Sequence, residues 1–234
     1  MVRGSTGMTI NALTEEVSSL LVRLREVPAP KPVITRQREK ELTTRQREVL
    51  DQLSDLFDSG FAEMTMSEIA SRVNCSLRTL YEIADSKDEL VLIVIDRNLR
   101  KVGRSAIEII DPWMTPLEAI RLYLEAATVA VESTTEEFAK DLEIVPSAQK
   151  LSKDHSDYLV AITRSLLDLA VERGDIADVD TAAVARVVAG LGRDFAHVDV
   201  MKDLRSSPKI AADDMLEIIM RGLVLTDTKE APWI

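Results

Sequence analysis

The stretch TMSEIASRVNCSLRTLYEIADSKDEL, residues 65–90, decides the fold. Its first part, residues 67–73, has the spacing of a short amphipathic helix, and Ser76 can cap a second helix that runs to about Ala84. Asn74 lies in the break between them, where the turn needs a residue that tolerates a positive φ. Two short helices with so tight a break predict a helix-turn-helix.

The segments on either side repeat apolar residues every three or four positions, which predicts an all-α protein without strands. An apolar stripe begins after Thr43 and ends at Ser59-Gly60, a typical helix end. Ser86 and Glu89 form a capping box that opens onto the apolar run Leu90–Ile95, so the next helix should be buried on every side. Further helices are expected at about 115–132, 135–143, 152–173, 180–199 and 208–224.

The N-terminal part contains a separate amphipathic helix at residues 13–25, which the Pro-rich segment at 28–32 stops. We expect this helix to be dispensable for folding, with its stripe docked on the rest of the protein; the stripe comprises Leu13, Val17, Leu20, Leu21 and Leu24. The pentapeptide TRQRE occurs at 35–39 and again at 44–48. Nine residues on a helix put the two copies on opposite faces, so we interpret this repeat as coincidence.

Charge is distributed unevenly along the chain. Residues 1–104 carry 16 Lys and Arg against 16 Asp and Glu, and residues 105–234 carry 13 against 24, which accounts for the net charge of −11. A neutral N-terminal module with local basic positions can bind nucleic acid, whereas the acidic remainder faces away from phosphates or is ordinary solvated surface.

Several protein classes are excluded by what the sequence lacks. The longest notable apolar run, Leu90–Ile95, is far shorter than the roughly 20 residues that cross a membrane. Cys75 is the only cysteine, and no secretory signal is recognisable, so we expect a cytoplasmic protein. His155 and His197 are 42 residues apart in the sequence without nearby ligands, and no phosphate loop or nucleophile motif occurs. We therefore expect no metal, no cofactor and no enzymatic activity.

Residues 49–90 resemble the DNA-binding domain of the TetR (tetracycline repressor) family. The matching elements, in order, are Leu56-Phe57, Gly60-Phe61, Thr65, Ile69-Ala70, Ser76-Leu77-Arg78-Thr79-Leu80-Tyr81 and Ser86-Lys87-Asp88-Glu89-Leu90. The chain departs from the family pattern at Asn74, Ile83 and Ala84, and the step from Phe57 to Gly60 is one residue short, which puts individual DNA contacts in doubt. The motif covers about a sixth of the chain.

A second similarity is to the helix-turn-helix that ends many response regulators, through LTTRQREVLDQL at residues 42–53. In that family Ile-Ala follows sooner than Ile69-Ala70 does here, and the domain is normally C-terminal. The spacing therefore favours the TetR resemblance.

The resemblance implies an N-terminal three-helix head with the helix-turn-helix and a C-terminal helical domain that binds an effector and dimerises. The chain then divides into an appendage and linker (1–33), a DNA-binding domain (34–103), an effector-binding and dimerisation domain (104–225) and a tail (226–234). The helix that starts near residue 86 alone should link the two domains, so we expect effector binding to weaken DNA affinity through it.

Helical spacing places Leu77, Arg78, Tyr81 and Glu82 on one face of the second short helix. Arg78 can contact guanine, Leu77 a thymine methyl group, and Glu82 either a cytosine amino group or Arg78 itself, four residues earlier. The resemblance assigns phosphate contacts to Thr65, Tyr81 and Lys87. The full predicted DNA-binding set is Arg45, Arg47, Thr65, Ser67, Ser76, Leu77, Arg78, Thr79, Tyr81 and Lys87. Alternatively, Thr65 and Ser67 are only structural caps and Lys87 is solvated surface.

The second half offers weaker signals. Its aromatic residues, one per helix, are candidates either for the core or for the lining of an effector cavity: Trp113, Tyr123, Phe138, Tyr158 and Phe195. Such a lining suits a largely apolar small molecule. The predicted dimer interface comprises Val187, Gly190, Leu191, Met215, Leu216, Ile219 and Leu223, flanked by Ala182, Ala183 and Ala212.

These expectations together describe a homodimer that represses transcription from a palindromic operator in double-stranded DNA until an effector releases it. A DNA-binding activator and a ligand-independent regulator with the same head remain alternatives.

Overall fold

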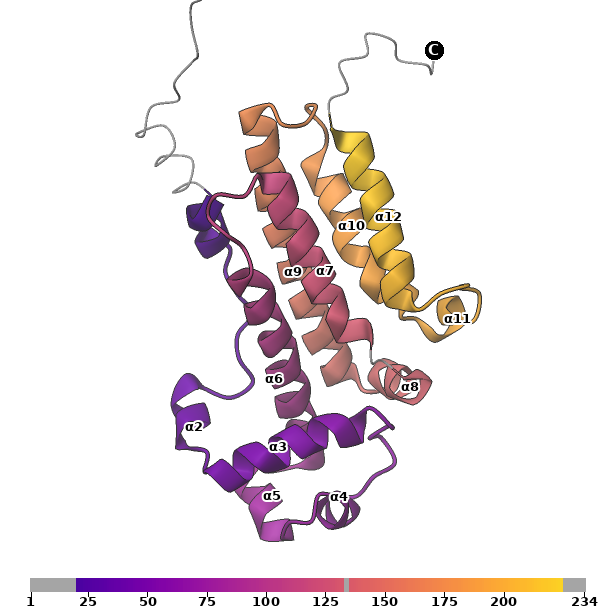
Figure 1. Ribbon diagram of the computed structural model, residues 1–234. Helices are drawn as coiled ribbons and strands as arrows, with labels where there is room; N and C mark the ends of the chain where they lie inside the picture. Colours follow the sequence, from indigo (N-terminus) through magenta and orange to yellow (C-terminus); the bar gives the residue numbers. More distant parts are fainter. Residues whose placement is uncertain (1–19, 133–134, 225–234) are drawn as a thin grey trace, which may run out of the picture.

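The computed structural model describes residues 20–132 and 135–224 of the chain, and this part is helical throughout (Figure 1). The helices are α2 (Arg36–Glu41), α3 (Thr44–Phe57), α4 (Met66–Arg72), α5 (Leu77–Ile83), α6 (Lys87–Glu108), α7 (Pro116–Glu132), α8 (Glu136–Ile144), α9 (Pro146–Arg173), α10 (Thr181–Phe195), α11 (Val198–Met201) and α12 (Pro208–Leu223). Residues 20–26 are helical as well. Within these residues the only β-type pairing is the isolated bridge between Ile176 and Val224, so the predicted all-α class is confirmed.

The molecule has a small head and a long body, joined by α6 (Figure 1). The head comprises α2–α5, and the body is a bundle of α7, α9, α10 and α12 against which the upper part of α6 packs. Each part has its own apolar core. Within the described residues, no helix is long and apolar enough to cross a membrane.

Hydroxyl side chains set the start of each head helix. Thr43 and Thr65 each form a complete capping box, with Gln46 and Glu68 respectively. Ser76 accepts a hydrogen bond from the backbone N–H of Thr79, which starts α5. Such caps satisfy N–H groups that the helix itself leaves unpaired.

The break between α4 and α5 has the backbone that the sequence predicts. Asn74 has a φ of 49°, and it is the only non-glycine residue with a positive φ in the described part of the chain. The turn therefore joins α4 and α5, two helices of seven residues each, as a helix-turn-helix requires.

Three helices differ from the expected ones. α9 begins at Pro146, six residues before the expected start, because Pro146 is at its first position and Ala148 and Leu151 bury their side chains in the head core. The expected helix 180–199 ends at Phe195, and the chain turns before Val198 enters the short α11. The first TRQRE copy forms α2, a helix that we did not expect, with Thr35 as its cap.

The described end of the N-terminal appendage is packed into the body. Leu20 and Leu24 belong to the body core, and Arg23 forms an ion pair with Glu172 of α9. The expected docking of the stripe therefore occurs for Leu20, Leu24 and the partly buried Leu21, whereas Leu13 and Val17 lie outside the described residues. Because burial of leucine stabilises a fold by about 1.5–3 kcal/mol per residue, the packing argues against the dispensability expected from the Pro-rich linker.

Residues 27–35, hereafter the strap, run from the body back to the head along α6 (Figure 1). Asp96 of α6 holds the strap by accepting a hydrogen bond from the backbone N–H of Val33, at 2.9 Å. Both Asp96 carboxylate oxygens also accept from Nε of Arg100, at 2.9 Å, and Nη2 of Arg100 donates to the carbonyl of Pro30. His155 of α9 lies 2.9 Å from Asp96 through Nε2. One buried carboxylate thus connects the strap, α6 and α9.

Burial alone would raise the pKa of Asp96, but hydrogen bonds from His155, Arg100 and Val33 outweigh it and hold that pKa below its ordinary value. A carboxylate whose pKa is lower in the folded protein stabilises the fold at pH values above its unfolded pKa, near 3.9. That stabilisation is lost as the pH falls through the folded pKa.

We predict that Asp96→Asn lowers the free energy of unfolding by about 3–5 kcal/mol near neutral pH, because it breaks a buried ion pair. The difference from the parent should begin to shrink as the pH falls below about 4, the unfolded pKa, and should be lost as the pH falls through the lower folded pKa of Asp96. Urea denaturation over this pH range measures both effects.

Asp51→Asn is the matched control, since Asp51 pairs with Arg97 on the exposed side of the head. It should cost no more than about 1 kcal/mol. Equal losses for the two variants would contradict the role given to Asp96.

Candidate nucleic-acid interface

α5 presents one face to solvent and the other to the head core. Leu80 and Ile83 are buried, whereas Leu77 is 41% and Tyr81 50% exposed. The Arg78 side chain is 88% exposed. Large exposed apolar and aromatic side chains next to an exposed arginine make this face suitable for base edges in a DNA groove.

Arg78 forms an ion pair with Glu82, one turn later, with 2.9 Å between Nε and Oε1. Glu82 also lies within 3.4 Å of the Gln46 amide of α3, and its backbone carbonyl accepts from Arg38 at 2.8 Å. In the structure, Glu82 therefore pairs with Arg78, which is one of its two expected roles. To contact a cytosine amino group, Glu82 would have to break this ion pair.

The hydroxyl groups predicted to contact DNA are occupied by helix caps. Thr65 accepts from the Glu68 backbone N–H at 3.2 Å and donates to the Glu68 carboxylate at 2.7 Å. The hydroxyls of Ser76 and Thr79 lie 2.8 Å apart at the start of α5. Ser67 is exposed in the first turn of α4. A capping hydroxyl retains a second lone pair or proton, so its structural role does not prevent a contact with phosphate.

Three of the four predicted basic residues donate hydrogen bonds to backbone carbonyls of the head. Lys87 donates to Ala62, Arg45 to Asn74 at 2.9 Å, and Arg47 to Lys40 at 3.1 Å. Lys87 is therefore not a freely solvated side chain, which was the alternative expected for it. An ammonium has three donors and a guanidinium five, so each residue keeps donors available for a phosphate.

The body touches the head through α8 as well as α6, which the sequence did not predict. A single oxygen of Asp141, Oδ2, accepts from the backbone N–H groups of Phe61 and Ala62, the latter at 2.8 Å. Phe61 also packs edge-on against Phe138, with 5.7 Å between ring centroids. The expectation that the helix from residue 86 alone links the two domains is therefore wrong.

Gly60 makes this contact possible. Its φ is +97°, which L side chains rarely adopt, and a Cβ there would lie 3.2 Å from Oδ2 of Asp141. The pattern Gly-aromatic was visible in the sequence, but nothing in it indicated that a carboxylate 80 residues later would bind the same turn.

A cavity of about 840 Å³ lies where head and body meet, lined by residues of α3, α6, α7, α8, α9, α10 and α12. Tyr123, Phe138 and Tyr158, three of the predicted candidates, line it, and burial raises the pKa of both phenols. Two predicted lining residues are elsewhere. Trp113 is 67% exposed in the turn before α7, and Phe195 is half-buried at the end of α10, outside the lining.

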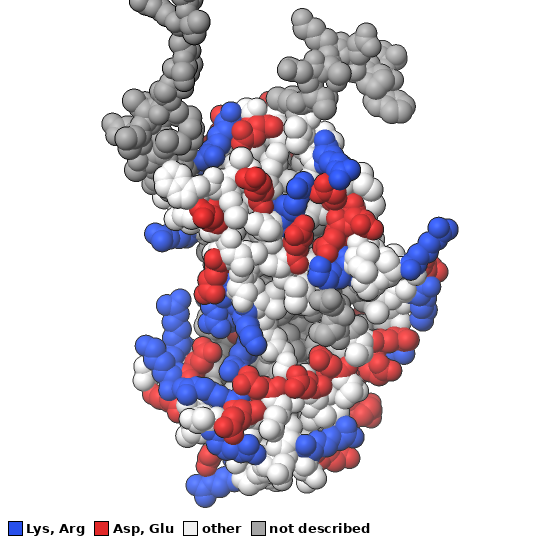
Figure 2. All heavy atoms as spheres, in the orientation of Figure 1, with Lys and Arg blue, Asp and Glu red and all other residues white. Residues whose placement is uncertain are grey.

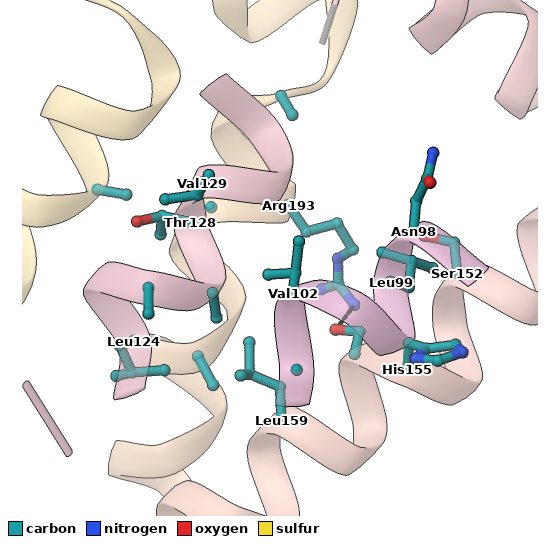
Figure 3. A pocket seen from close by; sticks show the side chains of 18 of the residues that line it. Asn98, Leu99, Val102, Leu124, Thr128, Val129, Ser152, His155, Leu159 and Arg193 are labelled. Carbon is teal, nitrogen blue, oxygen red and sulfur yellow. Dashed lines mark hydrogen bonds between the residues drawn. The ribbon is translucent and has the colours of Figure 1, made fainter. Parts of the chain in front are cut away.

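Asn98, Ser152 and His155 lie on one side of this mostly apolar cavity, and Thr128 lies on the other (Figure 3). Arg193 of α10 donates to the hydroxyl of Ser156 at 3.2 Å, and His155 lies nearby on α9 (Figure 3). His155 contacts Asp96, and His197 contacts Glu143 at 3.2 Å. No group of three or more potential metal ligands occurs among the described residues.

The predicted dimer residues do not share one exposed face. Val187 and Met215 are exposed, but Gly190 and Leu216 are buried, and Leu191, Ile219 and Leu223 are half-buried. Leu216 belongs to the body core because α12 packs that side onto α7 and α10. Ile218, which we did not predict, is 63% exposed on the outer side of α12.

Solved structures share this arrangement of helix-turn-helix head, joining helix and helical body. A TetR transcription regulator from Haloarcula marismortui ATCC 43049 aligns over 79% of this chain and 100% of its own, with 16% identity and a TM-score of 0.65. A TetR-like transcriptional regulator from Rhodococcus sp. RHA1 aligns over 76% and 94%, with 27% identity and a TM-score of 0.54. The TetR-family regulator PfmR from Thermus thermophilus aligns over 76% and 99%, with 24% identity and a TM-score of 0.52.

The chain thus has the fold of transcriptional regulators with a helix-turn-helix head and a helical body. Within that class its fold is TetR-like, as the motif in residues 49–90 indicated. No family model matches the sequence, and no curated protein does either.

We predict that Asp141→Asn weakens the docking of the head on α8, because an amide oxygen is a poorer acceptor than a carboxylate for two N–H groups. The free energy of unfolding should fall by about 1–3 kcal/mol. Hydrogen exchange of the Phe61 and Ala62 amides should accelerate as well.

Glu137→Gln is the control, since it removes the same charge from an exposed position one turn earlier on α8. If both variants leave the exchange of these amides unchanged, Asp141 does not hold the turn.

Proposed function

We propose that this protein is a sequence-specific DNA-binding transcriptional regulator that reads base pairs with α5. The observation that carries the proposal is the exposed row Leu77, Arg78 and Tyr81 on a helix whose opposite side is buried in the head core. A helix held in this way is rigid and can enter the major groove.

The ion pair between Arg78 and Glu82 does not oppose this role. An exposed pair one turn apart on a helix is worth about 0.3–0.5 kcal/mol. A bidentate contact from arginine to guanine contributes about 1–3 kcal/mol of discrimination. Arg78 therefore gains more from guanine than it loses by leaving Glu82.

The same proposal includes phosphate contacts from the head. The residues that would make them are Thr65, Ser67, Ser76, Thr79, Tyr81, Lys87, Arg45 and Arg47. Lys87 and Arg45 lie at carbonyls of the turns before and after α4, and Arg47 lies at a carbonyl of α2. Contacts of this kind orient a protein on DNA, and sequence is read by the base contacts.

We further propose a homodimer on a palindromic operator, formed through the outer faces of α10 and α12. Val187, Met215 and Ile218 leave exposed apolar surface there, which a two-fold partner would cover with the same surface. This assignment replaces the predicted interface around Leu216.

The third part of the proposal is repression that a small, largely apolar effector relieves from the cavity. Phe138 supports the link, because it lines the cavity and also packs against Phe61 of the head. Ile95 of α6 and Leu142 of α8 also line the cavity. Ile95 belongs to the head core, and Leu142 packs against it. An occupant that moves these walls would shift the head, with a coupling of about 1–3 kcal/mol. An activator and a ligand-independent regulator remain the alternatives.

The proposal predicts that Arg78→Ala relaxes base preference, because Arg78 is assigned to base edges. It should cost about 1–3 kcal/mol on the preferred operator and much less on unrelated DNA. Lys87→Ala should weaken binding to both DNAs and lower the salt slope by about one ion per half-site. Gel-shift titrations at several salt concentrations, on DNA upstream of the gene and its neighbours and on a scrambled duplex, measure both effects.

Glu82→Gln decides between the two roles of Glu82. If Glu82 only pairs with Arg78, the variant should bind both DNAs more tightly, and if it reads cytosine, preference at one base pair should relax. Equal weakening of both DNAs by Arg78→Ala would show that α5 does not read bases through Arg78, and absence of any selective DNA binding by the parent would refute the proposal.

Val187→Glu/Ile218→Glu should be monomeric in sedimentation while retaining its helical circular dichroism, because both side chains are exposed and their replacement leaves the core intact. The control variant, Ile109→Glu/Ile144→Glu, should stay dimeric. It changes exposed apolar residues at the ends of α6 and α8, away from the proposed interface. A dimeric Val187→Glu/Ile218→Glu variant would place the interface elsewhere.

A further inference from the structure

The residues just before the helix-turn-helix carry a concentration of positive charge. Residues 31–47 contain six Lys and Arg and two Glu, in a chain whose net charge is −11. Figure 2 shows Lys and Arg side chains gathering at the lower left of the molecule, where Figure 1 places α2. Three of these residues, Arg36, Arg38 and Lys40, are exposed on α2, and we call them the α2 basic surface.

Hydrogen bonds place this surface directly beside α5. Arg38 donates to the carbonyl of Glu82 in the last turn of α5, at 2.8 Å. At the opposite end, Arg45 donates to the carbonyl of Asn74, in the turn that precedes α5, at 2.9 Å. α2 and the start of α3 therefore flank α5 along its length, and a duplex that receives α5 in its groove brings a phosphate strand past α2.

The position of α2 is fixed by its connections. A helix of six residues does not persist by itself in water. On one side the strap is attached to α6 through Val33 and Asp96, and on the other side Leu42 is buried in the head core. α2 is consequently held in place before any DNA arrives.

Arg36 and Lys40 are four residues apart and share one side of α2. No carboxylate within the described residues forms an ion pair with either, although like charges at this spacing slightly destabilise a helix. Six other helical cations, by contrast, have a carboxylate one turn away: Arg78 with Glu82, Lys140 with Glu136, Lys150 with Asp154, Lys153 with Asp157, Lys209 with Asp213, and Arg221 with Glu217. The two unneutralised cations next to α5 match a polyanion.

We propose that the α2 basic surface binds phosphates that flank the half-site read by α5, with Arg36 and Lys40 as the contacts and Arg38 as the residue that positions α2 against α5. This inference rests on the proposed DNA-binding function and adds a contact outside the helix-turn-helix. Because phosphates carry no sequence information directly, the surface should add affinity and leave base preference unchanged.

The test uses the full chain and the duplex that it selects from a random-sequence pool, in two lengths. The short duplex contains the base pairs read by α5 and lacks the flanking base pairs that the parent also protects. The long duplex includes these flanking base pairs and extends beyond them on both sides. Arg36→Gln/Lys40→Gln should lower the salt slope on the long duplex by about 1.8 per half-site, since each phosphate contact contributes about 0.9. On the short duplex the variant and the parent should bind alike, and the hydroxyl-radical footprint of the variant should lose its outer edge.

Lys202→Gln/Arg205→Gln is the matched control, because it removes the same charge at exposed positions of the loop after α11. It should leave the slope and the footprint unchanged. The α2 proposal is overturned if Arg36→Gln/Lys40→Gln matches the parent on the long duplex, or if the control has the same effect. In either case selective binding by the parent still supports the proposed function, whereas a parent that selects no duplex removes both.

Discussion

The buried carboxylate of Asp96 is the interaction on which the arrangement of the molecule depends. It receives hydrogen bonds from the strap, from Arg100 of α6 and from His155 of α9, three segments that are distant in the sequence. Removing one partner would leave the others buried without compensation, which is why such networks stabilise only when complete. The same carboxylate fastens the strap two residues before the cap of α2, and it contacts His155 in the wall of the cavity.

Local signals in the sequence were sufficient for the helix-turn-helix, but not for α2, the head helix that we did not expect. Asn74 in the turn and the caps at Thr65, Ser76 and Ser86 act within a few residues, so spacing alone indicated them. Long-range partners left no such signal. Asp141 looks like any exposed helical carboxylate until the fold brings it to the 60–62 turn. The assignment of Leu216 to the dimer interface was wrong for another reason. α12 is apolar on two sides, and periodicity cannot tell which side faces the body and which side faces a partner.

Side chains from the body pack directly against the head core, and this packing determines how a change in one part can affect the other. Phe138 and Leu142 come from the body, yet they pack against the head core, as Ala148 and Leu151 do. Protein interiors are packed about as densely as organic crystals, so a wall residue cannot move without moving its neighbours. A cavity built from such residues is mechanically coupled to α3 and to the 60–62 turn, whatever occupies it.

The strap also limits how far the head can travel. Its nine residues reach at most about 30 Å when fully extended, and a backbone does not stretch beyond that. Leu20 and Leu24 anchor one end in the body core, Leu42 anchors the other in the head core, and Val33 is fastened between them. A movement of the head that pulls the strap along α6 must therefore break the hydrogen bond between Val33 and Asp96.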